Sequence, residues 1–262
     1  MFYMKENLDI ALLQCDLHWE SVAKNLIQIE EYLDEISNSD IILLPEMFST
    51  GFTVNSTHLA EAMDGETVCW MKSIAQKKAS VLCGSLMIKD ADHVYNRLLW
   101  VEPNGSIQHY DKRHLFSLIN EDKYFTTGKQ RLVVNYKDWK ICPLICYDLR
   151  FPVFSRNDVS YDLCFYLANW PNKRIAAWDA LLKARAIENQ AYTIGVNRIG
   201  IDGYNTEYSG HSKVLDPNGD LIALAPDNEI GFVQCSLSKH HLQEYRDHFP
   251  FLEDQDEFEL KI

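Results

Sequence analysis

The sequence predicts a fold in which helices are layered on β-sheet, of the α/β or α+β class. Short apolar runs alternate with longer amphipathic segments through most of the chain, which indicates alternating strands and helices. One amphipathic segment, 175–189, spaces its apolar residues three and four apart, as a helix lying on a sheet does. Further on, Asn218-Gly219 is a strong turn signal and indicates a hairpin. The order of the strands does not follow from these patterns.

The first half supplies a strand at 10–13, a helix at 21–36, a strand at 41–44 and a helix at 67–78. Apolar runs at 81–87, 95–101 and 107–110 then predict three further strands.

The second half continues with strands at 140–146, 163–168 and 192–197. Between the last two we expect the helix 175–189, whose buried stripe contains Ile175, Trp178, Leu182, Arg185 and Ala186. The hairpin is expected around Asp216-Pro217-Asn218-Gly219.

Composition favours one globular domain over residues 1–262, because 47% of residues are hydrophobic and no linker-like stretch divides the chain. The net charge of -13 argues against nucleic acid and anionic membranes as partners, since both require clustered Lys and Arg. The segment 1–10 lacks the apolar core of a signal peptide, and no uncharged run approaches the roughly 18 residues of a membrane span. We expect a cytoplasmic protein.

The cysteines indicate reduced core residues rather than disulfides or a metal site. There are seven, an odd number without paired spacing, and we expect all but Cys146 to be buried and inert. No two have the spacing of a zinc knuckle, and His240 and His241 are adjacent and so point apart. No metal and no cofactor are expected.

Three short segments place an ionisable side chain beside an apolar or extended run, and together they suggest a thiol hydrolase. Cys146 ends an apolar stretch, Glu46 follows Leu44-Pro45, and Lys112 lies in Tyr110-Asp111-Lys112-Arg113-His114. A cysteine attacks as the thiolate, yet its ordinary pKa of about 8.5 leaves little ionised at neutral pH. A carboxylate can accept the thiol proton, and a lysine, with the backbone amide after the cysteine, can stabilise the oxyanion.

Each segment also has an ordinary structural interpretation. Cys146 alone fits an inert buried thiol, Glu46 a carboxylate at a helix start, and Lys112 a solvated charged turn. Only their joint occurrence favours catalysis.

The three segments resemble the signature segments of the nitrilase superfamily, the carbon-nitrogen hydrolases. Leu44-Pro45-Glu46-Met47, 110–116 and 146–152 occur in the family's order and rough spacing, and similar context runs over nearly the whole chain. The resemblance implies an α-β-β-α sandwich whose protomers pair through helical faces, so we expect a homodimer or higher homo-oligomer. It also implies a catalytic triad of Glu46, Lys112 and Cys146, with Glu121 as a second glutamate that orients Lys112 or the attacking water.

Within the family, the segment 112–116 and the tail 245–252 look most like omega-amidases. This similarity implies a small-molecule substrate, a short 2-oxo dicarboxylic acid monoamide such as 2-oxoglutaramate. Water would cleave its terminal amide to give the 2-oxo acid and ammonia. Arg150 would bind the acid end through its planar fork; a salt bridge with Asp148 or another carboxylate that shapes the turn is the structural alternative. Phe116, Tyr147 and Trp170 are further expected substrate contacts, although aromatic residues in such runs are more often core.

Two other functions stay open at this point. One is a different carbon-nitrogen hydrolase, acting on a deaminated peptide amide, an N-carbamoyl amino acid or a nitrile. The other is a catalytically silent binding module on the same sandwich, against which the complete triad argues.

Overall fold

A computed structural model describes residues 7–260, and within that range most strands belong to two six-stranded sheets. The segment 1–10, where we read no signal peptide, therefore lies mostly outside the described residues. The first sheet has the order β14-β1-β2-β3-β4-β5. Its strands are β1 (Asn7–Gln14), β2 (Ile41–Leu43), β3 (Val81–Asp90), β4 (His93–Val101), β5 (Ile107–Asp111) and β14 (Gly231–Ser238).

The second sheet has the order β13-β12-β9-β8-β7-β6. Its strands are β6 (Val134–Tyr136), β7 (Trp139–Ile145), β8 (Leu163–Ala168), β9 (Tyr192–Asn197), β12 (Lys213–Leu215) and β13 (Leu221–Leu224). A separate two-stranded sheet pairs β10 (Ile199–Ile201) with β11 (Glu207–Ser209). The predicted hairpin joins β12 to β13, and Gly219 takes a positive φ of 80° at its turn.

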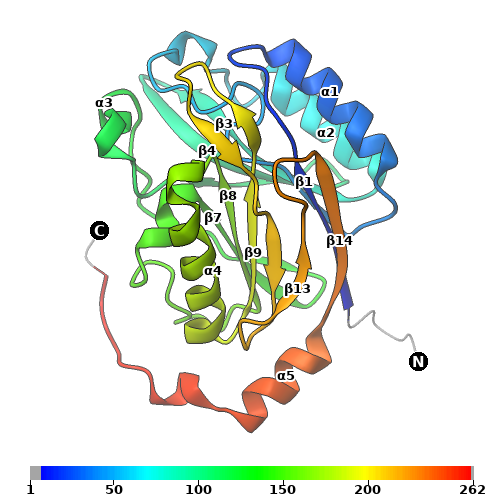
Figure 1. Cartoon of the computed structure of the whole chain (residues 1–262), viewed down its shortest axis with the longest axis vertical. Helices are drawn as coiled ribbons and strands as arrows, with labels where there is room; N and C mark the ends of the chain where they lie inside the picture. Colours follow the sequence, from blue (N-terminus) through cyan, green and yellow to red (C-terminus); the bar gives the residue numbers. More distant parts are fainter. Residues whose placement is uncertain (1–6, 261–262) are drawn as a thin grey trace.

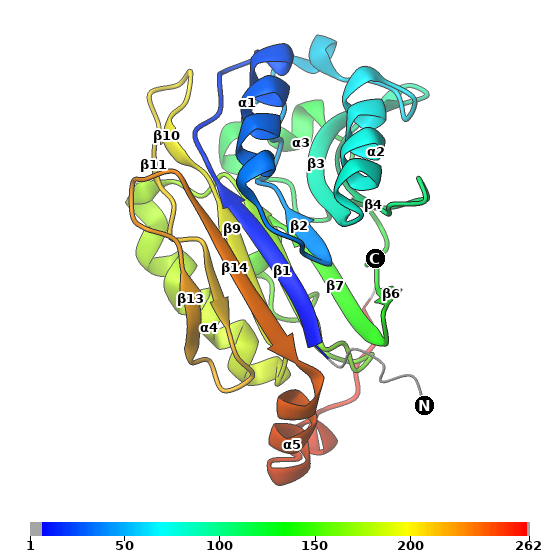
Figure 2. The same ribbon diagram turned by 90° about the vertical axis from the view of Figure 1, so that its right-hand side faces the viewer.

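Helices cover the outer faces of both sheets. Figures 1 and 2 show α1 (Val22–Glu35) and α2 (Glu66–Lys78) on one side of the molecule and α4 (Ile175–Asn189) on the other. The remaining α-helices are α3 (Glu121–Tyr124) and α5 (Lys239–His248). Short 3₁₀ turns occupy Thr57–Leu59, Ser117–Ile119, Cys146–Arg150, Asn172–Arg174 and Phe251–Asp254.

The alternation of side chains along β1 shows how the layers form. Leu8, Ile10 and Leu12 belong to the apolar cluster that continues into the second sheet. Ala11 and Leu13, which point the other way, pack in the cluster formed with α1 and α2. The predicted α-β-β-α sandwich is therefore confirmed.

The helix 175–189 has the predicted bounds. Trp178, Leu182, Arg185 and Ala186 of its expected stripe are buried, and Ile175 at its first turn is half-buried. Among residues 7–260, no helix is long and apolar enough to cross a membrane.

The cysteine prediction was wrong at two positions. Cys69 is exposed and Cys235 is half-buried, whereas the other cysteines are buried; all are free thiols. Cys69 lies on the solvent-facing side of α2, whose buried stripe includes Val68 and Met71. Membership in an amphipathic helix did not by itself place the thiol on the buried face.

Candidate active site

The predicted catalytic residues follow the ends of strands in the two sheets. Glu46 comes three residues after β2, Lys112 directly follows β5, and Cys146 directly follows β7. In the first sheet β2 and β3 are parallel, and β5 has the same direction because two antiparallel pairings separate it from β3. The carboxyl ends of β2 and β5 therefore lie at one edge of this sheet, and the contacts of Glu46 described below bring that edge to the second sheet.

Cys146 occupies a sharp turn between a strand and a 3₁₀ segment. We expected the strand to include Cys146, but β7 ends at Ile145. The backbone φ of Cys146 is 41°, in the left-handed region that few residues with a side chain adopt. Such strain is concentrated at functional sites, and here it holds the thiol at a cavity wall with 9% of the residue exposed.

Lys112 is buried between two carboxylates. Its Nζ lies 2.9 Å from Glu46 Oε1 and 3.0 Å from each carboxylate oxygen of Glu121, and all three side chains are at most 1% exposed. Burial lowers the pKa of Lys112, but the charges of Glu121 and Glu46 outweigh it, so the pKa is raised above its ordinary value. The ammonium is therefore retained at neutral pH.

Glu46 is held by donors from both sheets. Asn96 Nδ2 donates to its Oε1 at 2.9 Å, and the backbone N–H of Asn169 donates to Oε2 at 2.9 Å. The side-chain amide of Asn169 also donates to the Glu46 carbonyl at 2.6 Å. Asn96 lies in β4 and Asn169 follows β8, so this carboxylate joins the two sheets at the site.

The thiol of Cys146 is electrostatically coupled to this cluster. Burial raises the pKa of Cys146 well above its ordinary value, and the charge of Glu46 and a hydrogen bond to it raise the pKa further, while Lys112 opposes this. A protonated thiol beside a carboxylate that can accept its proton is the arrangement that a nucleophile with an adjacent base requires.

Glu121 is bound on its second side by the loop that precedes it. The backbone N–H of Phe116 donates to Glu121 Oε2 at 2.5 Å. Burial raises the pKa of Glu121, and the charge of Lys112 opposes that rise. The position of Glu121 against Lys112 fits the orienting role expected for it.

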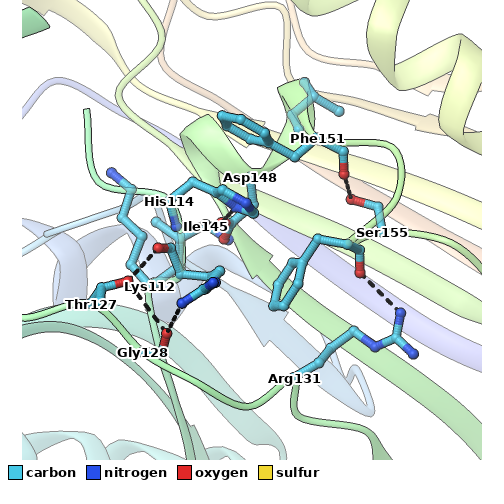
Figure 3. Close-up of polar contacts among 12 residues, drawn as sticks. Lys112, His114, Thr127, Gly128, Arg131, Ile145, Asp148, Phe151 and Ser155 are labelled. Atoms are coloured by element: carbon cyan, nitrogen blue, oxygen red, sulfur yellow. Dashed lines mark hydrogen bonds and ion pairs between the residues drawn. The ribbon is translucent and has the colours of Figure 1, made fainter. Parts of the chain in front are cut away.

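Asp148 connects the loop after Lys112 to the turn that contains Cys146 (Figure 3). Its Oδ1 accepts from the backbone N–H of His114 at 3.1 Å and lies 2.8 Å from the ring Nδ1 of His114. Its Oδ2 accepts from the Tyr110 hydroxyl at 2.8 Å and from the backbone N–H of Ile145 at 3.0 Å. The imidazole also stacks on Phe151, with ring centroids 3.7 Å apart. A fully buried carboxylate thus fixes the segments on both sides of the reactive centre.

A cavity of about 430 Å³ opens in front of Cys146. Lys112 and Cys146 line it together with every predicted substrate contact, namely Phe116, Tyr147, Arg150 and Trp170. Glu46 and Glu121 are not among its described lining residues, and their contacts place them behind Lys112. A cavity of this size suits a small molecule.

Arg150 does not form the salt bridge considered as its structural alternative. Both oxygens of Asp148 accept the other donors described above, and among residues 7–260 Arg150 makes no ion pair. Its guanidinium carbon instead lies 4.8 Å from the ring centroid of Trp170. This contact with the ring face leaves guanidinium N–H groups available to a ligand. Among residues 7–260, no group of three or more His, Cys, Asp and Glu side chains is placed to hold a metal.

Comparison with known proteins agrees with this geometry. A family model described as carbon-nitrogen hydrolase matches residues 9–247. The chain belongs to the carbon-nitrogen hydrolase family. Its enzyme class is therefore that of a hydrolase acting on carbon-nitrogen bonds, and the predicted family is confirmed.

Two curated relatives and one solved structure illustrate the similarity of this carbon-nitrogen hydrolase to known proteins. It is 44% identical to omega-amidase YafV of Escherichia coli K12, over 97% of this chain and 98% of that protein. It is 32% identical to the 2-oxoglutaramate amidase of Bacillus subtilis, over 94% and 96% of the two chains. XC1258 of Xanthomonas campestris, a CN-hydrolase superfamily protein with an arsenic adduct in its active site, superposes with a TM-score of 0.95 at 40% identity and covers 97% and 99% of the two chains.

Sequence reasoning missed several residues that shape the site of this carbon-nitrogen hydrolase. Asn96 is a polar residue next to the apolar run of β4, and Asn169 directly follows β8; both positions were visible signals. Asp148 was considered only as a partner of Arg150. Arg174, which lines the cavity, lies in the short segment before α4 and had no distinguishing pattern.

Proposed function

We propose that the protein is an omega-amidase, which hydrolyses the terminal amide of a short 2-oxo dicarboxylic acid monoamide such as 2-oxoglutaramate. The observation that carries the proposal is that Cys146, Lys112 and Arg150 line the same cavity. Arg150 makes no ion pair within the described chain, so its charge is available to a substrate. The named activities of the E. coli and B. subtilis relatives support the same substrate class. The net charge of -13 makes a local cation necessary for an anionic substrate.

In the proposed first half-reaction, Cys146 Sγ attacks the amide carbon while Glu46 accepts the thiol proton. Lys112 and the backbone N–H after Cys146 stabilise the oxyanion of the tetrahedral intermediate. Glu46 then donates its proton to the amide nitrogen, the carbon-nitrogen bond breaks, and ammonia leaves. A thioester between Cys146 and the acyl group remains.

In the second half-reaction, water attacks the thioester and Glu46 accepts its proton. The carbon-sulfur bond breaks, Cys146 regains a proton, and the 2-oxo dicarboxylic acid leaves. Glu121 holds the Lys112 ammonium in position through both steps. These roles use the side chains named above, the backbone N–H after Cys146 and water.

The substrate class is tested by comparing kcat/KM across compounds that share the triad chemistry. We expect kcat/KM for 2-oxoglutaramate to exceed that for N-carbamoyl amino acids and aliphatic nitriles by orders of magnitude. An N-carbamoyl amino acid presents a less electrophilic ureido carbon in place of a carboxamide, and an aliphatic nitrile offers no acid end to Arg150. An equal or reversed preference excludes the omega-amidase assignment in favour of another carbon-nitrogen hydrolase.

We further propose that residues 1–262 form one hydrolase domain, that the protein acts in the cytoplasm, and that it forms a homodimer or a higher homo-oligomer. The core shared by the two sheets supports the first proposal. The family resemblance supports the last. Analytical ultracentrifugation of the purified protein tests the oligomeric state, and a monomer at micromolar concentration contradicts it.

A further inference from the structure

The cavity in front of Cys146 contains a second guanidinium that neither the predicted site nor the proposed reaction uses. Arg174 ends the short 3₁₀ segment Asn172–Arg174 that leads into α4, and its side chain lines the cavity. Its guanidinium carbon lies 5.1 Å from the ring centroid of Phe116. Among residues 7–260 it makes no ion pair, so its charge is balanced by no described carboxylate.

Each of the two cavity arginines lies over an aromatic ring. Arg150 lies over Trp170 and Arg174 over Phe116. The indole N–H of Trp170 donates to the backbone carbonyl of Arg174 at 2.8 Å, which ties the backbone of the second arginine to the aromatic partner of the first. Contact with a ring face restrains each guanidinium and leaves N–H groups for a ligand.

The one carboxylate among the described lining residues is engaged elsewhere. Asp202 Oδ1 accepts from the backbone N–H groups of Tyr204 and Thr206, at 2.8 and 2.9 Å. Its Oδ2 accepts from the Tyr208 hydroxyl at 2.8 Å. These bonds organise the turn between β10 and β11, so Asp202 is not the partner that Arg174 lacks.

A bidentate guanidinium fills one acceptor site on each carboxylate oxygen. Because Arg150 and Arg174 lie over different aromatic rings, a ligand with a further oxygen acceptor beside its carboxylate can use both guanidinium groups. In a 2-oxo acid, the 2-oxo oxygen lies on the carbon next to the carboxylate. We infer that Arg174 is a specificity-determining residue that donates to the 2-oxo oxygen while Arg150 holds the adjacent carboxylate. This inference rests on the proposed function and names the part of the substrate that distinguishes it from a simple acid amide.

The inference predicts that the enzyme prefers an acid amide with a 2-oxo group to the same amide without one. A site built to hydrogen-bond a substrate oxygen discriminates strongly against an analogue that lacks it, because the site's own donor is then left unpaired. The matched pair is 2-oxoglutaramate and glutaramate, which have the same chain length, the same amide and the same carboxylate. The ratio of their kcat/KM values isolates recognition of the 2-oxo oxygen.

The experiment measures this ratio in the wild type, Arg174→Gln, Arg174→Lys and Lys173→Gln. We expect Arg174→Gln to lower the ratio by about tenfold or more, and Arg174→Lys to lower it less, since a point charge keeps part of the contact. Lys173 is exposed on the same short segment, so Lys173→Gln removes an equal charge next to the site and should leave the ratio unchanged.

The outcomes separate this inference from the proposed function. If the wild type hydrolyses 2-oxoglutaramate but Arg174→Gln slows both amides equally, Arg174 does not read the 2-oxo oxygen and the inference alone fails. If the wild type hydrolyses neither amide, the proposed function fails and the inference with it. If Arg174→Gln does not fold, Arg174→Lys provides the test. The inference is overturned if Arg174→Lys keeps the wild-type ratio of kcat/KM values and if 2-oxoglutarate and glutarate inhibit it in the same proportion as they inhibit the wild type.

Discussion

The ammonium of Lys112 lies 3.0 Å from both carboxylate oxygens of Glu121, and both side chains are buried. This contact is separate from the 2.9 Å contact that Lys112 makes with Glu46. One lysine therefore faces two carboxylates, of which one can exchange a proton with Cys146 while the other keeps the ammonium in place. In the proposed reaction, Glu46 and Glu121 therefore have different tasks although both contact the same cation.

Replacing Glu121 with Gln should lower kcat about a hundredfold or more. The amide keeps the shape of the side chain but removes one of the two charges that hold Lys112, so the oxyanion donor loses its alignment. Steady-state kinetics with 2-oxoglutaramate measure the effect, and circular dichroism checks that the fold is retained. A kcat within threefold of the wild type would show that Glu121 is dispensable.

Replacing Asp148 with Asn should reduce both stability and turnover. The Tyr110 hydroxyl and the backbone N–H groups of His114 and Ile145 donate to its carboxylate, and an amide NH₂ group cannot accept from them. We expect a loss of about 1–3 kcal/mol in the free energy of unfolding and a fall in kcat as the Cys146 turn shifts.

Asp122→Asn is the matched control for this change, because Asp122 is exposed on α3 close to the site. Urea unfolding and kinetics of the two variants are compared directly. Equal behaviour of Asp148→Asn and Asp122→Asn contradicts a connecting role for Asp148.

Replacing Arg150 with Lys should raise KM for acid-ended amides more than for neutral amides. The lysine keeps a charge in the cavity but not the bidentate fork, and a neutral amide makes no use of either. The expected effect is about tenfold or more in kcat/KM for 2-oxoglutaramate relative to a neutral amide of the same length. A uniform loss on both substrates indicates a structural arginine.

The stability of the protein should fall as the pH rises above about 8.5. Burial raises the pKa of Cys15 to about 12 and that of Cys164 to about 11. Between the unfolded pKa near 8.5 and these values, the folded state binds more protons than the unfolded state, so each thiol lowers the free energy of unfolding by about 1.4 kcal/mol per pH unit. The raised pKa of Lys112 acts in the same direction above about 10.4.

Urea denaturation at pH 7.5, 9 and 10 under reducing conditions measures this dependence. Replacing Cys164 with Ala should flatten the slope above pH 9, although it also removes some packing. A free energy of unfolding that rises from pH 8.5 to 10 would contradict the prediction that these thiols are buried in their neutral form.

Much of the site was predictable because its chemistry lies in three local segments. Glu46, Lys112 and Cys146 each occur beside a recognisable strand, and their order along the chain resembles that of a known family. The helix 175–189 was predictable for a similar reason, since its periodicity is a local property. The positive φ of Cys146 was not, because nothing in its neighbourhood distinguishes it from a strand residue.

The strand order and the supporting contacts depend on pairings between distant segments, which a period-2 pattern does not specify. For example, β1 pairs with β14 at the far end of the chain. The bonds of Glu46 to Asn96 and Asn169 likewise require strands from both sheets to be placed first. Arg174 likewise contacts the ring of Phe116, which belongs to another loop.

The most direct test of the central claim is ammonia release from 2-oxoglutaramate by the purified protein, measured beside Cys146→Ala. The structure predicts rapid release by the wild type and a loss of at least about a thousandfold in the variant, whose smaller side chain at a buried turn leaves the fold intact. Equal release by both proteins would contradict the assignment of Cys146 as the nucleophile.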